Sequence, residues 1–299
     1  MTIANPPSPR SGYIAIVGRP NAGKSTLLNA LIGQKISITS RRPQTTRQNI
    51  AGILTCVNAQ LVFLDTPGFQ TEYRTGLTKA MDRGFKNALS EAHAVLWLID
   101  VTANDHADSE LFARLPDTAS LVIAVNKIDK IDNKNKVLEY IQALDAAYHP
   151  KAVVPISAKN KLQLDTLIEA LTPLLPQQAF LYAEDNITTS SVRSLTAELI
   201  REKLFRLLGQ ELPYSTAVEI ETFEEKPALT RIRAVILVDK PGQKAIVIGK
   251  GGEKLKEIGT AARLDIEKLV DGKVFLELWV KVKQSWADDR RTLDRLGLS

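Results

Sequence analysis

A chain of 299 residues is long for one compact domain and sufficient for two, each with its own hydrophobic core. Its 44% hydrophobic and 24% charged residues are typical of a globular protein, and a single cysteine excludes a disulfide scaffold and favours a reducing compartment. The first dozen residues lack the apolar core of a signal peptide, and no apolar run reaches the length of a membrane span, so we expect a soluble or at most peripheral protein.

A phosphate-binding loop is predicted at residues 18–25, whose sequence GRPNAGKS matches the pattern G-x-x-x-x-G-K-[ST]. An apolar, β-rich run at 13–17 precedes it and a helical pattern ending at Gly33 follows it, which is the context that this motif requires. Backbone N–H groups of such a loop cradle phosphates, while Lys24 reaches the β and γ phosphates and Ser25 binds Mg²⁺. The expected nucleotide contacts of the loop are Gly18, Asn21, Ala22, Gly23, Lys24, Ser25 and Thr26.

Two further segments supply groups around the γ phosphate and Mg²⁺. Thr46 is the predicted switch ligand of the metal, with Thr45 as the alternative, because adjacent threonines cannot be separated by sequence. The motif DTPG at 65–68 provides Asp65, which would bind Mg²⁺ through water, and the Gly68 N–H, which would sense the γ phosphate. Thr66 and Pro67 complete this part of the nucleotide site, and the predicted catalytic groups are Lys24, Thr46 and Gly68.

Phe69 stands where Ras-like enzymes place a glutamine that orients the attacking water. An aromatic ring can neither orient nor deprotonate water, so unaided hydrolysis is expected to be slow. Acceleration must then come from the substrate phosphate, a backbone group or a partner such as RNA. Asn21 is similar to the residue that ligates K⁺ in cation-dependent GTPases; a local hydrogen bond within the loop is the alternative.

The motif NKID at 126–129 predicts guanine as the base. The Asp129 carboxylate can accept two hydrogen bonds from the N1–H and N2–H₂ groups that guanine has and adenine lacks. Asn126 would tie this loop to the phosphate loop, and the Lys127 stem would pack along the base. The turn SAK, formed by Ser157, Ala158 and Lys159 after the apolar run 153–156, would bring a backbone N–H to the guanine carbonyl.

Apolar strand runs alternate with helical patterns from residue 13 to about 175, which predicts a mostly parallel sheet with helices on both faces. The motifs follow the carboxyl ends of the strands, where such sheets bind ligands. A turn-rich stretch then interrupts the pattern. The expected division is a disordered tail at 1–11, a P-loop GTPase domain at 12–180, a linker at 181–194 and a second domain at 195–299.

The second domain has the expected order helix, two strands, two helices and a strand, with the tetrad GKGG at 249–252 between its last two helices. This is the arrangement of a KH domain, whose G-x-x-G loop clamps the backbone of single-stranded nucleic acid. Residues 226–283 carry 13 basic and 7 acidic side chains, an excess that can attract a polyanion but is also common on a solvated face, so it does not by itself indicate nucleic acid. The predicted RNA contacts are Lys244, Gly249, Lys250, Gly251, Gly252 and Lys254.

The whole chain resembles the Era family of bacterial ribosome-assembly GTPases. The motifs that carry the resemblance are GRPNAGKST at 18–26, QTTR at 44–47, ELPY at 211–214, VIGKGG at 247–252 and SWADD at 285–289. It implies an α/β P-loop GTPase domain followed by an α+β type II KH domain, with Mg²⁺ and GTP or GDP as ligands. It further implies binding to 16S ribosomal RNA near its 3′ end, a role in small-subunit maturation, and a monomer in the cytoplasm with a peripheral membrane fraction.

Gln70 departs from the family pattern, which often has histidine at this position, so no role is carried onto it. Two other functions remain open from the sequence. A tRNA-modifying or translational GTPase would carry extra catalytic domains or a cysteine motif. A non-hydrolysing RNA-binding scaffold would use GTP only as a structural ligand.

Overall fold

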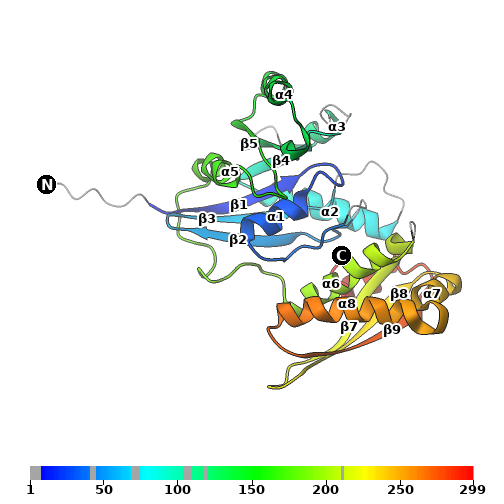
Figure 1. Ribbon diagram of the computed structural model, residues 1–299. Helices are drawn as coiled ribbons and strands as arrows, with labels where there is room; N and C mark the ends of the chain where they lie inside the picture. The colour runs from blue at the N-terminus through cyan, green and yellow to red at the C-terminus, as the bar shows by residue number, and fades with distance from the viewer. Residues whose placement is uncertain are drawn as a thin grey trace. The chain divides into compact units, whose positions relative to one another are not determined.

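The computed structural model describes residues 8–40, 45–68, 75–103, 109–116, 120–209 and 212–298. Contacts divide the chain into two compact units, each of which is described here by itself (Figure 1). The first unit comprises described residues within 1–37, 49–71 and 83–189, and the second those within 38–48, 72–82 and 190–299. The domain limits expected from the sequence remain a prediction.

The described part of the first unit contains a six-stranded sheet with the strand order β2-β3-β1-β4-β5-β6. All neighbouring strands are parallel except β2, which runs antiparallel to β3. The expectation of a mostly parallel sheet is confirmed. The strands are β1 (Arg10–Val17), β2 (Ile50–Cys56), β3 (Ala59–Asp65), β4 (Ala94–Asp100), β5 (Ser120–Asn126) and β6 (Ala152–Pro155).

Helices cover both faces of this sheet, as the alternating pattern predicts. Ile14 and Ile16 of β1 pack in the cluster that contains the apolar side chains of α1 and α5, while Ala15 and Val17 pack on the side of α2, α3 and α4. Successive residues of a strand point to opposite faces of the sheet, so β1 contributes side chains to the hydrophobic cores on both faces. The helices are α1 (Lys24–Ile32), α2 (Gly76–Glu91), α3 (Ser109–Phe112), α4 (Lys134–Tyr148) and α5 (Leu164–Leu171).

The second unit contains the sheet β7-β8-β9, in which β8 pairs antiparallel with β7 and parallel with β9. The apolar faces of α6, α7 and α8 form its main core with one face of this sheet. Trp286, α9 and the first turns of α2 pack on Ala217, Val235 and Leu237 of the strands. The elements are α6 (Val192–Leu207), β7 (Thr216–Glu224), β8 (Thr230–Val238), α7 (Pro241–Ile248), α8 (Glu253–Leu269), β9 (Val274–Val282) and α9 (Arg290–Arg295).

Some element boundaries differ from the expectation for local reasons. The α6 helix begins at Val192, three residues early, because Ser191 caps it by accepting a hydrogen bond from Ser194 N at 3.1 Å. The helix expected up to Leu175 ends at Leu171, and a 3₁₀ turn containing Pro173 follows. Among the described residues, no helix has the length and apolarity needed to cross a membrane.

Candidate functional site

The predicted phosphate loop connects the end of β1 at Val17 to the start of α1 at Lys24. The Lys24 ammonium donates to the carbonyl oxygens of Gly18 and Arg19, each at 3.0 Å. Burial lowers the pKa of Lys24 to about 8, although the nearby Asp65 carboxylate acts in the opposite direction. The lysine is thus held inside its own loop, where phosphate oxygens would replace the two carbonyls as partners.

Asn126 joins the phosphate loop to the two loops expected to bind the base. Its Nδ2 donates to Ala22 O at 2.8 Å, and its Oδ1 accepts a hydrogen bond from Ala158 N at 3.0 Å. Gly23 makes this approach possible, because a Cβ added there would lie 2.4 Å from Asn126 Nδ2 and its φ of +106° disfavours any side chain. The link that the sequence predicts between the NKID and phosphate loops is therefore present. The Ala158 N–H, however, is already used by Asn126.

Asp129 lies in the 3₁₀ turn Ile128–Lys130 after β5, and its Oδ1 accepts a hydrogen bond from Ser157 Oγ at 2.5 Å. The SAK turn thus orients the carboxylate expected to recognise guanine. Lys127 has a φ of +67° and donates to Asn21 O at 2.8 Å and to Asp100 Oδ2 at 2.5 Å. Burial opposes the charged form of Asp100, but hydrogen bonds from Lys127 and Thr102 outweigh it and lower the pKa of this carboxyl.

Oxygen atoms that could serve as Mg²⁺ ligands lie close together at the end of β3. Asp65 is fully buried, and its Oδ2 accepts hydrogen bonds from Ser25 Oγ at 2.7 Å and from Ser37 Oγ at 2.9 Å. Hydroxyl and carboxylate oxygens are the hard ligands that Mg²⁺ prefers, so these residues fit the ion. Ser37 is held by Asn29, whose Oδ1 accepts from the N–H groups of both Ile36 and Ser37 at 2.9 Å.

The rest of the DTPG motif lies against the phosphate loop. Thr66 Oγ1 donates to Ile16 O of β1 at 2.8 Å. Gly68 is so close to Pro20 that a Cβ added there would lie 3.1 Å from the Pro20 backbone nitrogen. Pro67 lies between Thr66 and Gly68 in the sequence. The first unit contains the predicted residues Gly18, Asn21, Ala22, Gly23, Lys24, Ser25, Thr26, Asp65, Thr66, Pro67, Gly68, Asn126, Lys127, Asp129, Ser157, Ala158 and Lys159. The contacts above join the phosphate, DTPG, NKID and SAK segments that carry them.

Thr45 and Thr46 belong to the second unit, whereas Ser25 and Asp65 belong to the first. Thr46 is only 5% exposed, and the Thr45 carbonyl accepts a hydrogen bond from Arg201 of α6. The choice between the two threonines as magnesium ligand stays a prediction. Gln44, Phe69, Gln70 and Glu211, which the sequence also singled out, lie outside the described residues.

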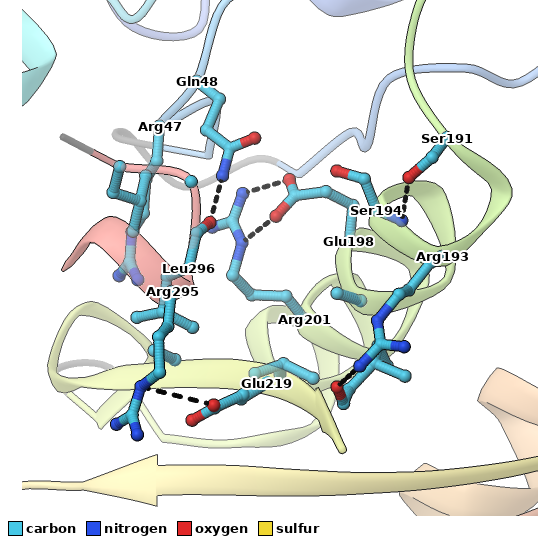
Figure 2. A pocket seen from close by; sticks show the side chains of 16 residues that line it. Arg47, Gln48, Ser191, Arg193, Ser194, Glu198, Arg201, Glu219, Arg295 and Leu296 are labelled. Carbon is cyan, nitrogen blue, oxygen red and sulfur yellow. Dashed lines mark hydrogen bonds and ion pairs between the residues drawn. The ribbon is translucent and has the colours of Figure 1, made fainter. Parts of the chain in front are cut away.

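Arg47 is the strongest anchor of the segment 45–48 within the second unit. Its guanidinium donates to Thr216 O at 2.7 Å, Tyr214 O at 2.9 Å and Pro213 O at 3.1 Å, and it lies 5.8 Å from the centre of the Trp286 ring. Burial, reinforced by the charge of Arg201, lowers the pKa of Arg47 to about 9. Figure 2 shows Arg47 and Gln48 at a cavity of about 430 Å³ that α6, β7 and the C-terminal residues also line.

The G-x-x-G loop at Gly249–Gly252 connects α7 to α8 in the second unit. Lys244 and Lys250 are exposed, whereas Lys254 is half-buried and pairs with Glu257 at 2.7 Å. Gly252 has a φ of +84°, and no heavy atom lies within 4 Å of a Cβ added there. The loop backbone is therefore open to a ligand at this glycine, as close approach of a phosphate would require.

The fold and these sites define a P-loop GTPase joined to a KH domain. A family model described as "50S ribosome-binding GTPase" matches residues 13–127, and a KH domain model matches residues 211–287. The chain is 51% identical to GTPase Era of Chromobacterium violaceum, over 96% of this chain and 97% of that protein, and 46% identical to GTPase Era of Nitrosomonas eutropha over the same shares. The chain belongs to the Era family of GTPases.

Two solved structures match nearly the whole chain, each with a TM-score of 0.93 and covering 97% of this chain and 99% of the other. One is a variant of Aquifex aeolicus Era bound to GDP and AlF₄⁻, at 37% identity. The other is Era in complex with MgGDPNP and nucleotides 1506–1542 of 16S ribosomal RNA, at 38% identity. The predicted combination of a GTPase fold and a KH fold is confirmed.

Sequence reasoning missed several residues that hold the site together. Ser37 and Asn29 carry no motif, because their contacts depend on how the chain returns after α1. Asp100 had one usable signal, since it ends a buried strand at the edge where ligands bind. The anchoring role of Arg47 depends on carbonyl oxygens more than 160 positions away in the sequence and has no local signature.

Proposed function

We propose that this chain is a GTP-hydrolysing switch that binds 16S ribosomal RNA near its 3′ end through its KH domain and assists assembly of the small ribosomal subunit. The observation that carries the proposal is a full-length relative whose structure holds a GTP analogue, magnesium and that RNA together. The junction at Asn126 and the open G-x-x-G loop are the two features of this chain that suit these ligands.

The proposed roles follow from the contacts of each residue. Ser25 and Asp65, with Thr46 from the segment 45–48, would hold Mg²⁺. The bound ion would neutralise charge on the β and γ phosphates. Lys24 would exchange its carbonyl partners for phosphate oxygens and stabilise the negative charge that develops there. Asp129, oriented by Ser157, would accept the two guanine donors, and the Gly68 N–H would report the γ phosphate.

We further propose K⁺ as a second cation near Asn21, whose φ of +66° turns the chain within the phosphate loop. A monovalent cation beside the phosphates could supply the positive charge that an arginine finger supplies elsewhere. The GTP hydrolysis rate in KCl and in NaCl at equal ionic strength tests this role. Equal rates in the two salts would remove K⁺ from the mechanism.

The cellular setting is also part of the proposal. A cytoplasmic monomer with a peripheral membrane fraction is what the family resemblance implies. The net positive charge of residues 226–283 would attract either an RNA or an anionic surface, and the G-x-x-G loop favours RNA as its principal ligand. Fractionation of cells expressing the tagged protein tests the membrane fraction.

Nucleotide binding is expected to draw a proton onto Lys24, because phosphates favour the charged ammonium. With a pKa of about 8, half of these side chains are neutral at that pH, so binding should take up about half a proton there and almost none below about pH 6.5. Calorimetry in buffers of different ionisation enthalpy measures the uptake.

The control variant is Lys24→Arg, which is expected to stay charged at both pH values and to bind nucleotide without uptake. Uptake equal at both pH values would contradict the lowered pKa. Because the unfolded chain holds this proton up to a pKa of 10.5, Lys24 also makes folding more favourable as pH rises from about 8 towards 10.5.

The experiment for the function as a whole is a titration of GDPNP and GDP with and without an RNA of nucleotides 1506–1542. A switch requires RNA to tighten GDPNP relative to GDP, by about 5- to 150-fold for typical coupling, and linkage makes the effect reciprocal. Equal ratios with and without RNA would favour the alternative, a scaffold in which GTP is structural.

A further inference from the structure

Three consecutive charged residues of α6 are buried: Arg201 is 3%, Glu202 0% and Lys203 7% exposed. Successive residues of a helix point about 100° apart, so this run places charges on more than one side of α6. Charged side chains are rarely this buried unless each has a partner. The partners of these three residues lie in two different parts of the second unit.

Arg201 and Glu202 contact the described residues Thr45 and Thr39. Arg201 Nη2 donates to the Thr45 carbonyl, next to the predicted magnesium ligand Thr46. The same guanidinium donates to Glu198 from Nε at 2.8 Å and from Nη2 at 2.6 Å, and Figure 2 shows this pair. Glu202 Oε1 accepts from Thr39 N at 3.1 Å. The α6 helix therefore contacts this part of the chain at Thr39 and at Thr45.

Lys203 contacts the helix that follows the G-x-x-G loop. Its ammonium pairs with Asp265 of α8, and it also donates to Glu202 Oε2 at 3.3 Å. The α8 helix begins at Glu253, directly after Gly252. One continuous set of polar contacts therefore runs from Thr39 through Glu202 and Lys203 to Asp265 on the helix that carries the loop.

We propose that Glu202 and Lys203 form a relay that couples Thr39 to α8, while Arg201 holds Thr45, so that RNA on the G-x-x-G loop alters the switch. Glu202 shares one carboxylate between Thr39 and Lys203, so a shift of α8 that moves Lys203 changes the strength of the bond to Thr39. This inference rests on the proposed function and assigns positioning residues to it, none of which needs to touch either ligand.

The charges are not needed to fill the space that these residues occupy. Well-packed hydrophobic residues of similar volume often replace a buried ion pair without loss of stability. Three buried charges in a row, with the acidic Glu202 between two basic residues, are compatible with ion pairs that exchange partners when the domain changes conformation. The carboxylate pairs with Arg206 as well, at 2.9 Å, so it keeps a cationic partner when either of its other bonds weakens.

The test measures the coupling factor, which is the ratio of GDPNP affinity to GDP affinity with the 1506–1542 RNA divided by the same ratio without it. Lys203→Met and Asp265→Asn each cut the relay at its α8 end. We expect both variants to reduce the factor from its wild-type value to below about 2, while the affinity for GDPNP alone and for RNA alone each changes less than about 3-fold. The double variant should lose no more coupling than either single variant.

Arg263→Gln is the matched control, because it breaks an ion pair of similar length, 2.6 Å to Glu267, within α8 itself. It should keep the wild-type coupling factor. Wild-type coupling in both Lys203→Met and Asp265→Asn would overturn the relay and leave the proposed function intact. A wild-type factor of 1 would overturn the switch and the relay together, so the two failures are distinguishable.

Discussion

Asp129→Asn is expected to weaken GTP binding by roughly 100-fold or more and to raise the affinity for XTP. The carboxylate accepts from two guanine donors, whereas an amide presents its own N–H₂ group to one of them and leaves buried donors facing each other. Xanthine carries a carbonyl at that position, which the amide can satisfy. Ser157 Oγ holds the same carboxylate at 2.5 Å, so an asparagine in this place would be held in a similar orientation.

Competition of GTP and XTP against a fluorescent nucleotide measures this change. The matched control is Asp132→Asn, which removes the same charge from an exposed position three residues later and should leave both affinities unchanged. If Asp129→Asn binds GTP as the unchanged protein does, guanine is not recognised by this carboxylate.

Gly252→Asp is expected to reduce RNA affinity by about 10- to 100-fold while GTP affinity stays within about 2-fold, because a carboxylate would face the phosphate that the loop must approach. A Cβ at Gly252 meets no heavy atom within 4 Å, so the domain itself has room for the side chain. The effect should therefore come from charge rather than from a clash.

The control for this variant is Gly252→Asn. Asparagine has the same shape without the charge, and like aspartate it tolerates the φ of +84° better than most residues. It should retain most of the RNA affinity in a filter-binding assay at moderate salt. Retained affinity in Gly252→Asp under the same conditions would contradict the KH interface.

The nucleotide site could be predicted where one short stretch of sequence carries both the loop conformation and the groups that bind the ligand. The phosphate loop and the NKID loop each follow a buried strand, and parallel strands bring their carboxyl ends to one edge, so Asn126 and Ala22 meet as expected. The same reasoning located the G-x-x-G loop between α7 and α8, because element order and glycine spacing are local signals.

Contacts between distant segments could not be predicted from one sequence. The residues 38–48 and 72–82 read as parts of the first domain, yet their described residues cluster with the second unit. Leu77, for example, donates its N–H to Ala287 O at 2.8 Å and packs with Trp286. Nothing in the periodicity of either segment indicates such a partner, and the buried charges of α6 gave no signal because charged helical residues are usually exposed.

The proposed switch requires RNA bound by the KH domain to act on the GTPase site, and single-turnover GTP hydrolysis with and without the 1506–1542 RNA measures this action. With enzyme in excess over GTP, and Mg²⁺ at a saturating concentration, product release does not contribute to the measured rate. We predict slow hydrolysis by the protein alone and a rate at least about 5-fold higher with saturating RNA, because a partner can supply transition-state stabilisation that the protein alone lacks. Identical rates with and without RNA, at concentrations where RNA binding is demonstrated, would contradict the account.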